Sequence, residues 1–443
     1  MSGASGASGA SRHHVVIIGS GFGGLFAAKA LRRAPVDLTV IDRTNHHLFQ
    51  PLLYQVTTGI LSEGQIAPPI RDVLRHNPSV EVVLGEVTDI DPVARTVATT
   101  ELSGRTVDIG FDSLIVAAGA VTSYYGHDEF RHSASGMKSL NDALYLRGQI
   151  FGSFEQAEAE DDEERRRALM TFVVIGGGPT GVEMAGQLKE LSRRALQDNY
   201  RKIDPHMTRV VLVEGGPGLV ATMGARLSRM TARDLERMGV ELHFGAMVTD
   251  VDPDGVELTQ SDGTHLRIEA STKVWAAGTR ASPLGAKVAA ATGAKLDRSG
   301  RVEVEPDCSV PGHPEIFVVG DLMALNDLPG VAEVAMQSGA HAAHTIERRL
   351  RGDTAVKPLR YHDLGTLAVI SRFRAVAKVG PLQIGGFVGW LLWLVVHVTF
   401  LTGFKNRFAA LARWTISFLG RGRYERALTG AWVVDRNGPS EAA

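Results

Sequence analysis

A chain of 443 residues is long enough for two or three domains, and a hydrophobic content of 44% supplies the apolar side chains that their cores need. The formal net charge is only −2, so the composition gives no reason to expect a nucleic-acid-binding protein. Cys308 is the sole cysteine, which excludes internal disulfides, clusters of thiolate metal ligands and redox chemistry based on a cysteine pair.

Residues 1–12 are rich in Ser, Gly and Ala and contain no long apolar run. A secretory signal peptide requires such a run, so this composition predicts a disordered tail and gives no indication of export.

The first chemical motif is a strand, a glycine-rich turn and a helix that begin near residue 13. Val and Ile dominate the strand, and the turn then brings together Gly19, Ser20, Gly21, Phe22, Gly23 and Gly24. Glycines allow a tight turn and the close approach of a pyrophosphate, and the helix N-terminus adds unpaired N–H groups. Asp42 ends the next strand, 23 residues after Gly19, near the usual distance for a carboxylate that binds a ribose hydroxyl.

A second copy of this pattern begins near residue 170. Its turn contains Gly176, Gly178, Pro179, Thr180 and Gly181, and Glu214 ends the strand after the helix. No Arg or Lys stands beside Glu214, and its carboxylate would repel a 2′-phosphate, so this site should prefer NAD(H) to NADP(H). Together, the two motifs predict a protein that holds two dinucleotides.

Later strands repeat features of the two units. Residues 112–119 and 273–278 both end in Ala-Ala-Gly, and small residues let the backbone pass close to a cofactor. Strand 315–321 ends in Asp321, and a helix from about 331 to 351 should lie under that site. The charged run 155–167 predicts a solvated helix or connector without a site.

The segment from Leu364 to Tyr424 differs from the rest of the chain. It contains no Asp or Glu, eight basic residues and three of the five tryptophans. Its centre, 387–404, has 18 residues without a formal charge, a borderline length for a membrane span. Residues 405–419 are amphipathic, and one face gathers Phe408, Leu411, Ala412, Thr415, Phe418 and Leu419. This pattern predicts a monotopic anchor on anionic lipid, separate from the nucleotide-binding core. A single membrane span and a buried dimer face are the alternatives.

These elements predict an α/β chain with two Rossmann-like dinucleotide-binding domains and a C-terminal helical membrane-anchoring segment. We expect the first domain at 13–165 with a second part at 286–363, and the other domain at 166–285. The membrane-associated amphipathic helices and tail should occupy 364–443.

The chain resembles the type II NADH dehydrogenases, the single-subunit NADH:quinone oxidoreductases of respiratory membranes, in particular their actinobacterial members. The resemblance runs from His13 to Arg423, and its motifs are 18–24, 46–55, 178–186, 317–321 and the basic, apolar tail. It implies the two-dinucleotide-binding flavoprotein fold, with non-covalent FAD bound at the first glycine motif and NADH bound as substrate at the second.

The resemblance also implies roles for individual residues. For FAD it implies the six residues of the first glycine-rich turn (19–24), together with Asp42, Arg43, Val87, Ala118, Gly119, Gly320, Asp321, Ala332 and Lys378. For NADH it implies Gly176, Gly178, Pro179, Thr180, Gly181, Glu214 and Gly278, with Glu183 as the catalytic residue near the nicotinamide. It places the quinone beside Glu333 and Gln337; Gln337 matches the family motif, whereas Glu333 replaces a glutamine.

The predicted function is oxidation of NADH by hydride transfer to FAD, followed by transfer of two electrons to menaquinone or ubiquinone. We expect no proton pumping, because the sequence offers no set of membrane helices with ionisable residues. The protein should be a homodimer, peripheral on the cytoplasmic face of the cell membrane, with no metal site.

Disulfide reductases and sulfide:quinone oxidoreductases share the two-motif plan, but they rely on cysteines that one Cys308 cannot supply. The alternatives that remain are an NADH-dependent flavoprotein reductase of a protein electron carrier, and a membrane-tethered NAD(H)-sensing flavoprotein.

Overall fold

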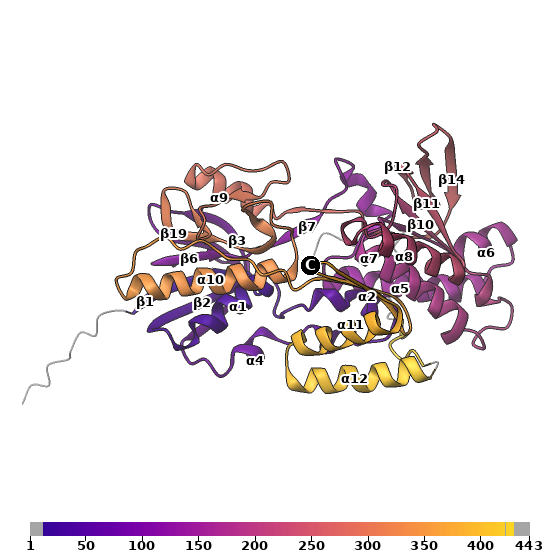
Figure 1. The fold of residues 1–443 in the computed structure, drawn as a ribbon, viewed down its shortest axis with the longest axis horizontal. Coiled ribbons are helices and arrows are strands. Elements are labelled where there is room, and N and C mark those ends of the chain that lie inside the picture. Colours follow the sequence, from indigo (N-terminus) through magenta and orange to yellow (C-terminus); the bar gives the residue numbers. More distant parts are fainter. Residues whose placement is uncertain (1–11, 421, 429–443) are drawn as a thin grey trace, which may run out of the picture. The chain divides into compact units, whose positions relative to one another are not determined.

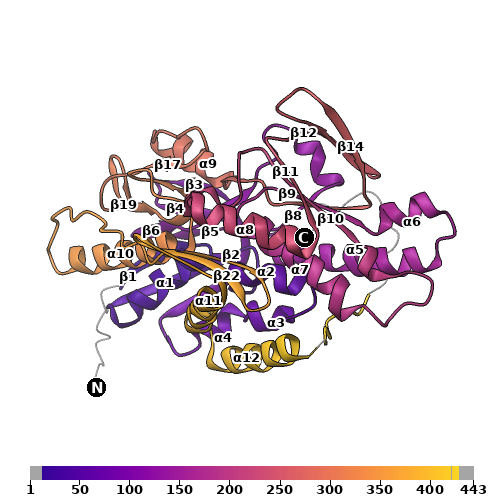
Figure 2. The same ribbon diagram turned by 45° about the vertical axis from the view of Figure 1, so that its right-hand side comes forward.

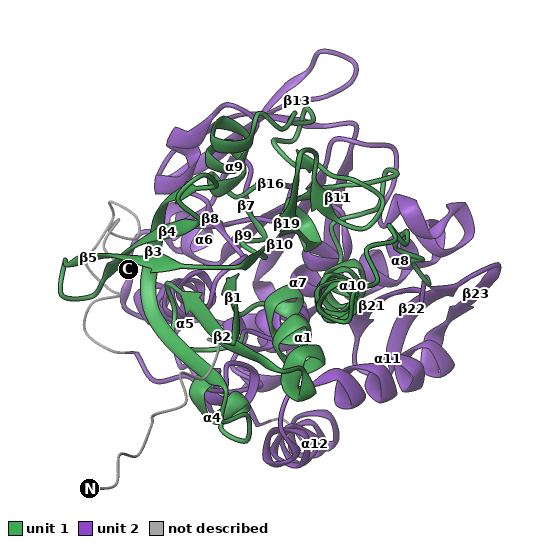
Figure 3. Cartoon of the chain, turned by 90° about the vertical axis from the view of Figure 1, so that its left-hand side faces the viewer, with its two compact units in different colours: residues 1–47, 69–121, 280–362 green, residues 48–68, 122–279, 363–443 purple. Residues whose placement is uncertain are grey.

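A computed structural model describes residues 12–420 and 422–428. The chain forms two compact units, each assembled from three chain segments (Figure 3). Unit 1 contains the residues up to 47, 69–121 and 280–362, and unit 2 contains 48–68, 122–279 and the residues from 363 onward. Residues 1–11 of the predicted N-terminal tail lie outside the described residues.

The units divide the chain differently from the predicted domains. Residues 122–165 and 48–68, which we expected in the first domain, belong to unit 2, as does the C-terminal segment. The reason is a helix that the sequence pattern did not predict, α5 (Leu140–Ala159), which buries Phe151 and Phe154 within unit 2. The charged run at 155–167 ends this helix and then forms α6 (Glu163–Leu169).

Unit 1 is built on an eight-stranded sheet in the order β18-β19-β6-β1-β2-β3-β4-β5. Its parallel strands are β1 (His13–Ile18), β2 (Val36–Asp42), β3 (Val80–Asp91), β6 (Ser113–Val116) and β19 (His313–Val318). Antiparallel strands extend both edges: β4 (Thr96–Glu101), β5 (Thr106–Gly110) and β18 (Ser309–Val310). The central strands are continuous runs of buried β-branched residues, as expected for a sheet covered on both faces.

Two helices of unit 1 pack directly on each other, α1 (Phe22–Ala30) and α10 (Ala332–Leu350). A Cβ atom at Gly339 would overlap the backbone carbonyl of Gly23, so this glycine pair lets the helices approach closely. Further elements of unit 1 include α4 (Ile70–Leu74), α9 (Leu284–Thr292), β17 (Val302–Glu303) and β20 (Met323–Ala324).

Unit 2 contains a five-stranded parallel sheet in the order β11-β10-β9-β15-β8. The strands are β8 (Ser135–Gly136), β9 (Thr171–Ile175), β10 (Arg209–Glu214), β11 (Val240–Phe244) and β15 (Thr272–Trp275). Helices α7 (Pro179–Glu190) and α8 (Ala225–Met238) follow β9 and β10. An antiparallel sheet adjoins them: β12 (Met247–Val251), β13 (Gly255–Thr259) and β14 (His265–Glu269). Residues 48–68 add the short helices α2 (Leu53–Thr57) and α3 (Glu63–Ile66).

The C-terminal segment of unit 2 begins with an antiparallel sheet, β21 (Thr366–Ser371), β22 (Arg374–Val379) and β23 (Leu382–Gly385). Two helices follow, α11 (Gly386–Phe400) and α12 (Phe404–Leu419), which lie side by side in both views (Figures 1 and 2). The predicted amphipathic helix at 405–419 is confirmed as α12. Within residues 12–420 and 422–428, no helix combines the length and apolar character needed to cross a membrane.

Candidate functional site

The first glycine motif forms a tight turn between β1 and α1 in unit 1. Gly19 has a φ of +96°, and a Cβ atom there would lie 2.5 Å from the carbonyl oxygen of Ala117. A Cβ atom at Gly24 would overlap the carbonyl oxygen of Gly19. At Gly21, which caps α1, a Cβ atom would meet nothing within 4 Å, so the backbone there borders open space. This is the arrangement that a pyrophosphate needs at a helix N-terminus.

The carboxylate of Asp42 braces this turn. One oxygen accepts hydrogen bonds from the backbone N–H and hydroxyl of Ser20 (2.6 and 2.7 Å), and the other accepts from the N–H and hydroxyl of Thr44 (2.7 and 2.8 Å). A carboxylate offers about four acceptor sites, so the protein already uses them all. A ribose hydroxyl at Asp42 would therefore replace one of the two side-chain hydroxyls.

The other residues predicted for FAD lie in unit 1, except for Lys378. Phe22 packs edge-on against the buried His47, with ring centroids 5.3 Å apart, whereas Gly23 faces α10. Five residues lie near strand ends or helix starts of this unit: Arg43, Ala118, Gly119, Gly320 and Asp321. Val87 instead lies within β3, where it pairs with Thr99 of β4. Ala332 begins α10. Lys378 lies in unit 2, where its ammonium donates to the carbonyl of Thr222 at 3.0 Å.

The second glycine motif repeats this construction in unit 2. Gly176 has a φ of +109°, and its Cβ atom would lie 2.6 Å from the carbonyl of Ala276 and from Cα of Ala277. A Cβ atom at Gly181 would overlap the carbonyl oxygen of Gly176. Gly178 caps α7 and borders open space, and Pro179 and Thr180 form the first turn of the helix. The two units thus contain the same backbone cradle at the carboxyl end of a parallel sheet.

Glu214 closes the second cradle but keeps free acceptor capacity. Its two oxygens accept one backbone hydrogen bond each, from Gly177 and from Gly216, both at 2.6 Å. About two of its four acceptor sites remain for the hydroxyls of a ribose. Glu214 therefore fits the predicted ribose-binding role better than Asp42 does.

Glu183 lies in α7 and is only 7% exposed. Its carboxylate accepts a hydrogen bond from the backbone N–H of Val369 in β21, at 3.2 Å. Burial raises the pKa of Glu183 well above its ordinary value, and the single hydrogen bond opposes this only in part. The structure thus places the predicted catalytic carboxyl about one turn beyond the N-terminus of α7.

The two residues predicted for quinone, Glu333 and Gln337, lie on one face of α10 and hold the segment that follows it. The amide of Gln337 pairs with the backbone of His362, donating to its carbonyl at 2.8 Å and accepting from its N–H at 2.9 Å. The Tyr361 hydroxyl donates to the Glu333 carboxylate at 3.3 Å. A quinone at this position would have to bind beside these hydrogen bonds.

The C-terminal helices present an apolar outer face. Its exposed side chains are Phe387, Val388, Leu391, Val395, Phe404, Phe408, Leu411, Ile416 and Leu419. Five of the six residues predicted to share a face of α12 are exposed; Phe418 is instead buried, together with Trp414 on the inner side.

The inner side of this segment corrects the prediction of an anchor separate from the core. The indole of Trp414 donates to the Gln55 side chain at 2.6 Å. Beyond α12, the buried guanidinium of Arg423 donates to Gln187 of α7 at 2.8 Å and contacts the carbonyl of Thr58 at 3.4 Å. Burial lowers the pKa of Arg423 to about 10, although nearby acidic groups oppose the shift. The segment is therefore part of the core of unit 2.

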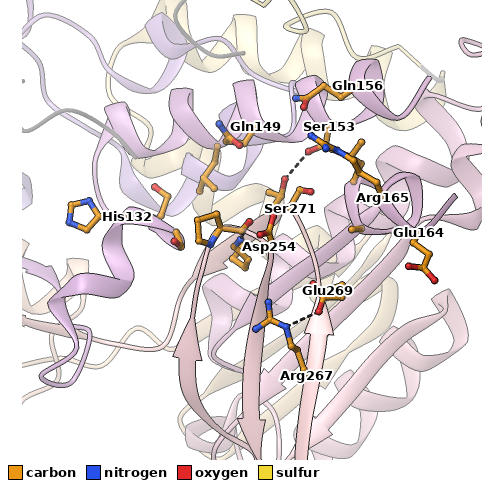
Figure 4. Close-up of a pocket in the computed structure, with 18 of the residues that line it drawn as sticks. His132, Gln149, Ser153, Gln156, Glu164, Arg165, Asp254, Arg267, Glu269 and Ser271 are labelled. Atoms are coloured by element: carbon orange, nitrogen blue, oxygen red, sulfur yellow. Dashed lines mark hydrogen bonds and ion pairs between the residues drawn. The ribbon is translucent and has the colours of Figure 1, made fainter. Parts of the chain in front are cut away.

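Unit 2 also contains a cavity of about 780 Å³, remote from the cradle (Figure 4). It lies among α5, α6 and the sheet of β12–β14, and Gln149, Arg165, Asp254 and Arg267 are among its lining residues. Thr272, the first residue of β15, also lines this cavity, which therefore lies at the amino ends of the parallel strands. Dinucleotides bind at the carboxyl ends, and no predicted site residue lines this cavity.

Comparisons with known proteins agree with the two cradles. A family model described as pyridine nucleotide-disulphide oxidoreductase matches residues 13–339. The type II NADH:quinone oxidoreductase Ndh of Mycobacterium tuberculosis is 52% identical over 420 residues, which cover 94% of this chain and 90% of that protein. NdhA of the same organism is 51% identical over 429 residues, covering 96% and 91%. The solved structure of NDH2 from Plasmodium falciparum in complex with NADH has a TM-score of 0.84 at 19% identity, covering 93% of this chain and 99% of that one, and so shares the fold.

Proposed function

We propose, for a chain that belongs to the pyridine nucleotide-disulphide oxidoreductases and among them to the type II NADH:quinone oxidoreductases, that unit 1 binds FAD and unit 2 binds NADH. The chain is an NADH:quinone oxidoreductase, and the family expected from its motifs is confirmed. One observation carries the proposal: each unit contains a complete dinucleotide cradle of the same construction.

The unit 1 cradle fits the pyrophosphate of FAD. Gly19 and Gly24 leave no room for side chains, Gly21 borders open space, and α1 directs its N-terminal N–H groups there. When bound, FAD supplies a carrier that accepts a hydride and releases two electrons. Residues near Gly119 and Asp321 would hold the rest of the cofactor.

In the unit 2 cradle, Glu214 accepts the ribose hydroxyls of NADH and disfavours a 2′-phosphate. The N-terminus of α7 binds the pyrophosphate, and Glu183 lies one turn further along this helix. We assign Glu183 a role near the nicotinamide, as a buried carboxyl whose raised pKa favours the neutral, hydrogen-bond-donating form.

The acceptor is a membrane quinone, menaquinone or ubiquinone, with Glu333 and Gln337 beside its site. We propose that the apolar outer face of α11 and α12 rests in an anionic lipid surface, since nine large apolar side chains are exposed there. The enzyme acts as a homodimer on the cytoplasmic face of the cell membrane and does not pump protons.

The decisive experiment is steady-state NADH oxidation by the purified protein, with ubiquinone and menaquinone analogues compared and the extracted flavin identified by chromatography. We expect FAD, quinone-dependent oxidation of NADH, and much slower oxidation of NADPH. Reduction of the flavin by NADH without reoxidation by any quinone would reject quinone as acceptor. In sealed vesicles, a pH-sensitive dye should show no proton translocation during turnover.

A further inference from the structure

An exposed tyrosine lies against the second cradle, on a segment that neither motif includes. The hydroxyl of Tyr125 donates to the carbonyl of Ala277 at 2.6 Å. A Cβ atom at Gly278 would overlap this hydroxyl and would lie 2.9 Å from the ring carbon that bears it. The backbone of Ala277 also lies against Gly176, the first glycine of the cradle. One backbone layer therefore separates the cradle glycine from the Tyr125 ring.

The backbone at Tyr125 is held in an unusual conformation that exposes this ring. Its φ is +55°, in the left-handed region that bulky residues avoid. Two hydrogen bonds fix the segment at the end of β15: Ser123 donates its N–H to Gly278 at 3.1 Å, and the Trp275 indole donates to the Ser123 carbonyl at 2.8 Å. As a result Tyr124 is buried, whereas Tyr125 is 68% exposed.

The strand order indicates which half of NADH would meet this ring. Glu214 ends β10, where the adenosine ribose binds, and the pyrophosphate binds at the turn after β9. In the sheet, β15 is on the other side of β9 from β10. A dinucleotide that continues in the same direction therefore passes its nicotinamide half over the end of β15, where Gly278 and Tyr125 lie.

We infer that the exposed ring of Tyr125 is a contact for the nicotinamide ring of NADH, held in place by the hydrogen bond of its hydroxyl to Ala277. The inference rests on the proposed binding of NADH in unit 2 and adds a specificity-determining residue to that site. Gly278 serves this contact, because any side chain there would displace the tyrosine.

The test compares NAD⁺ with ADP-ribose, which keeps the adenosine and pyrophosphate but lacks the nicotinamide. Dissociation constants are measured by calorimetry on the FAD-loaded enzyme and its variants. For Tyr125→Leu we expect NAD⁺ to bind about tenfold more weakly, equivalent to about 1.4 kcal/mol, and ADP-ribose to bind within about twofold of its original affinity. Tyr125→Phe keeps the ring and should weaken NAD⁺ binding by less than about threefold. The NADH concentration that half-saturates flavin reduction should follow NAD⁺.

Two further variants control for indirect effects. Glu214→Ala should weaken both ligands, whereas Met207→Ala, an exposed apolar residue just before the amino end of β10, should weaken neither. An equal loss of both ligands in Tyr125→Leu, or no loss of either, would overturn the inference while leaving NADH binding in unit 2 intact. If the unmodified protein binds neither ligand and NADH does not reduce its flavin, the proposed function itself fails. Bound FAD and the thermal transition show whether each variant is folded.

Discussion

Among single residues, the two cradle carboxylates differ in how much of their hydrogen-bonding capacity the protein itself uses. Asp42 accepts four hydrogen bonds from Ser20 and Thr44, whereas Glu214 accepts only two, both from backbone N–H groups. Both residues end the second strand of their motif, so the sequence could identify them but not distinguish them. The number of neighbouring hydroxyls decides which one is free to bind a ribose.

Nucleotide preference should depend on Glu214. We expect Glu214→Ala to raise the KM for NADH about tenfold, because a charged acceptor is lost and Gly177 and Gly216 lose their partner. NADPH should be affected less, because the repulsion of its 2′-phosphate also disappears. The measurement is kcat/KM for both donors, with Glu236→Ala on the exposed face of α8 as control. An unchanged ratio of the two values would contradict this role.

Glu183 should make stability depend on pH. Burial raises its pKa in the folded protein above the 4.5 of the unfolded chain, so the folded protein retains the proton to higher pH. The stabilisation by this neutral carboxyl is complete below pH 4.5 and declines as the pH rises through the folded pKa. Glu183→Gln stays neutral, so between pH 5 and 8.5 its Tm should fall less than that of the unmodified protein. Thermal unfolding followed at several pH values measures this difference, and parallel Tm curves for the two proteins would contradict it.

The same variant tests the proposed catalytic role. In stopped flow, Glu183→Gln should slow reduction of the flavin by NADH while FAD remains bound. Normal reduction with slow reoxidation would assign Glu183 to the quinone half-reaction instead.

Glu333 is the departure from the family motif, and Tyr361 is its partner in the structure. Glu333→Gln restores the family pattern and removes a charge near the proposed quinone site. We expect the apparent KM for quinone to change by about threefold or more, roughly 0.7 kcal/mol, with the KM for NADH unchanged. Glu347→Gln, on the same helix and paired with Arg351, serves as control. If both variants behave like the unmodified enzyme, Glu333 only holds the following segment.

Among the helices, α7 and α12 are joined by residues that lie far from α7 in the sequence. Gln187, in the last turns of α7, accepts from Arg423, which is 236 residues later in the chain. We define residues 422–428 as the C-terminal strap; it also contains Glu425, paired with Arg413 of α12 at 3.0 Å. The strap therefore ties the amphipathic helix α12 to α7, the helix that begins at the second cradle.

Removing the strap's buried cation should destabilise unit 2. Arg423→Gln leaves the Gln187 amide and the Thr58 carbonyl without a charged donor, and we expect a loss of about 2–3 kcal/mol. Arg426→Gln, in the same strap, loses only an exposed hydrogen bond to Asn199 and should change stability by less than about 1 kcal/mol. Urea unfolding followed by tryptophan fluorescence compares them. Equal stability of the two variants would show that the strap is not part of the core.

The sequence predicted those elements that depend on residues close together in the chain. The cradles could be predicted because a positive φ and a close backbone approach require glycine at Gly19 and Gly176. Helix α12 could be predicted because its apolar side chains repeat at helical spacing. By contrast, α5 was not predicted, because the charged run at its end indicates a solvated segment and gives no sign of the buried Phe151 and Phe154. The contacts of Arg423 with Gln187 and of Tyr125 with Gly278 join residues far apart in the sequence, so no local pattern predicts them.

For the whole molecule, the structure changes the expected balance of forces at a membrane. Eight cations were expected to add attraction to anionic lipid, but two of them are paired with carboxylates and a third is buried: Arg374 pairs with Asp234, Arg413 pairs with Glu425, and Arg423 is buried. Arg421 lies outside the described residues. The apolar face of α11 and α12 should therefore dominate the affinity, and salt should release little protein.

This balance is tested best by changing the surface alone. Cutting the chain near Gly380 would also remove Trp414 and Arg423 from the core of unit 2, so a loss of binding would be ambiguous. Phe408→Ser with Leu419→Ser changes side chains that are 71% and 73% exposed. We expect this double variant to retain FAD and to co-sediment with anionic liposomes at least about tenfold less, since about 3 kcal/mol of apolar contact is removed. The control, Val93→Ser with Leu102→Ser, alters two exposed residues of unit 1. Undiminished sedimentation of the first variant would reject this face as the lipid contact.

The discontinuous units also order the events of synthesis on the ribosome. Every segment of unit 1 has been translated once residue 362 is made, whereas unit 2 still lacks β21 to α12 and the strap. The nascent chain can therefore complete its first dinucleotide cradle while the buried side of α7 still lacks Arg423. A truncated chain that ends between residue 362 and Arg423 would contain all of unit 1, but its unit 2 would have an uncovered apolar surface. We expect cellular quality control to recognise such chains by unit 2, even when they have already bound flavin.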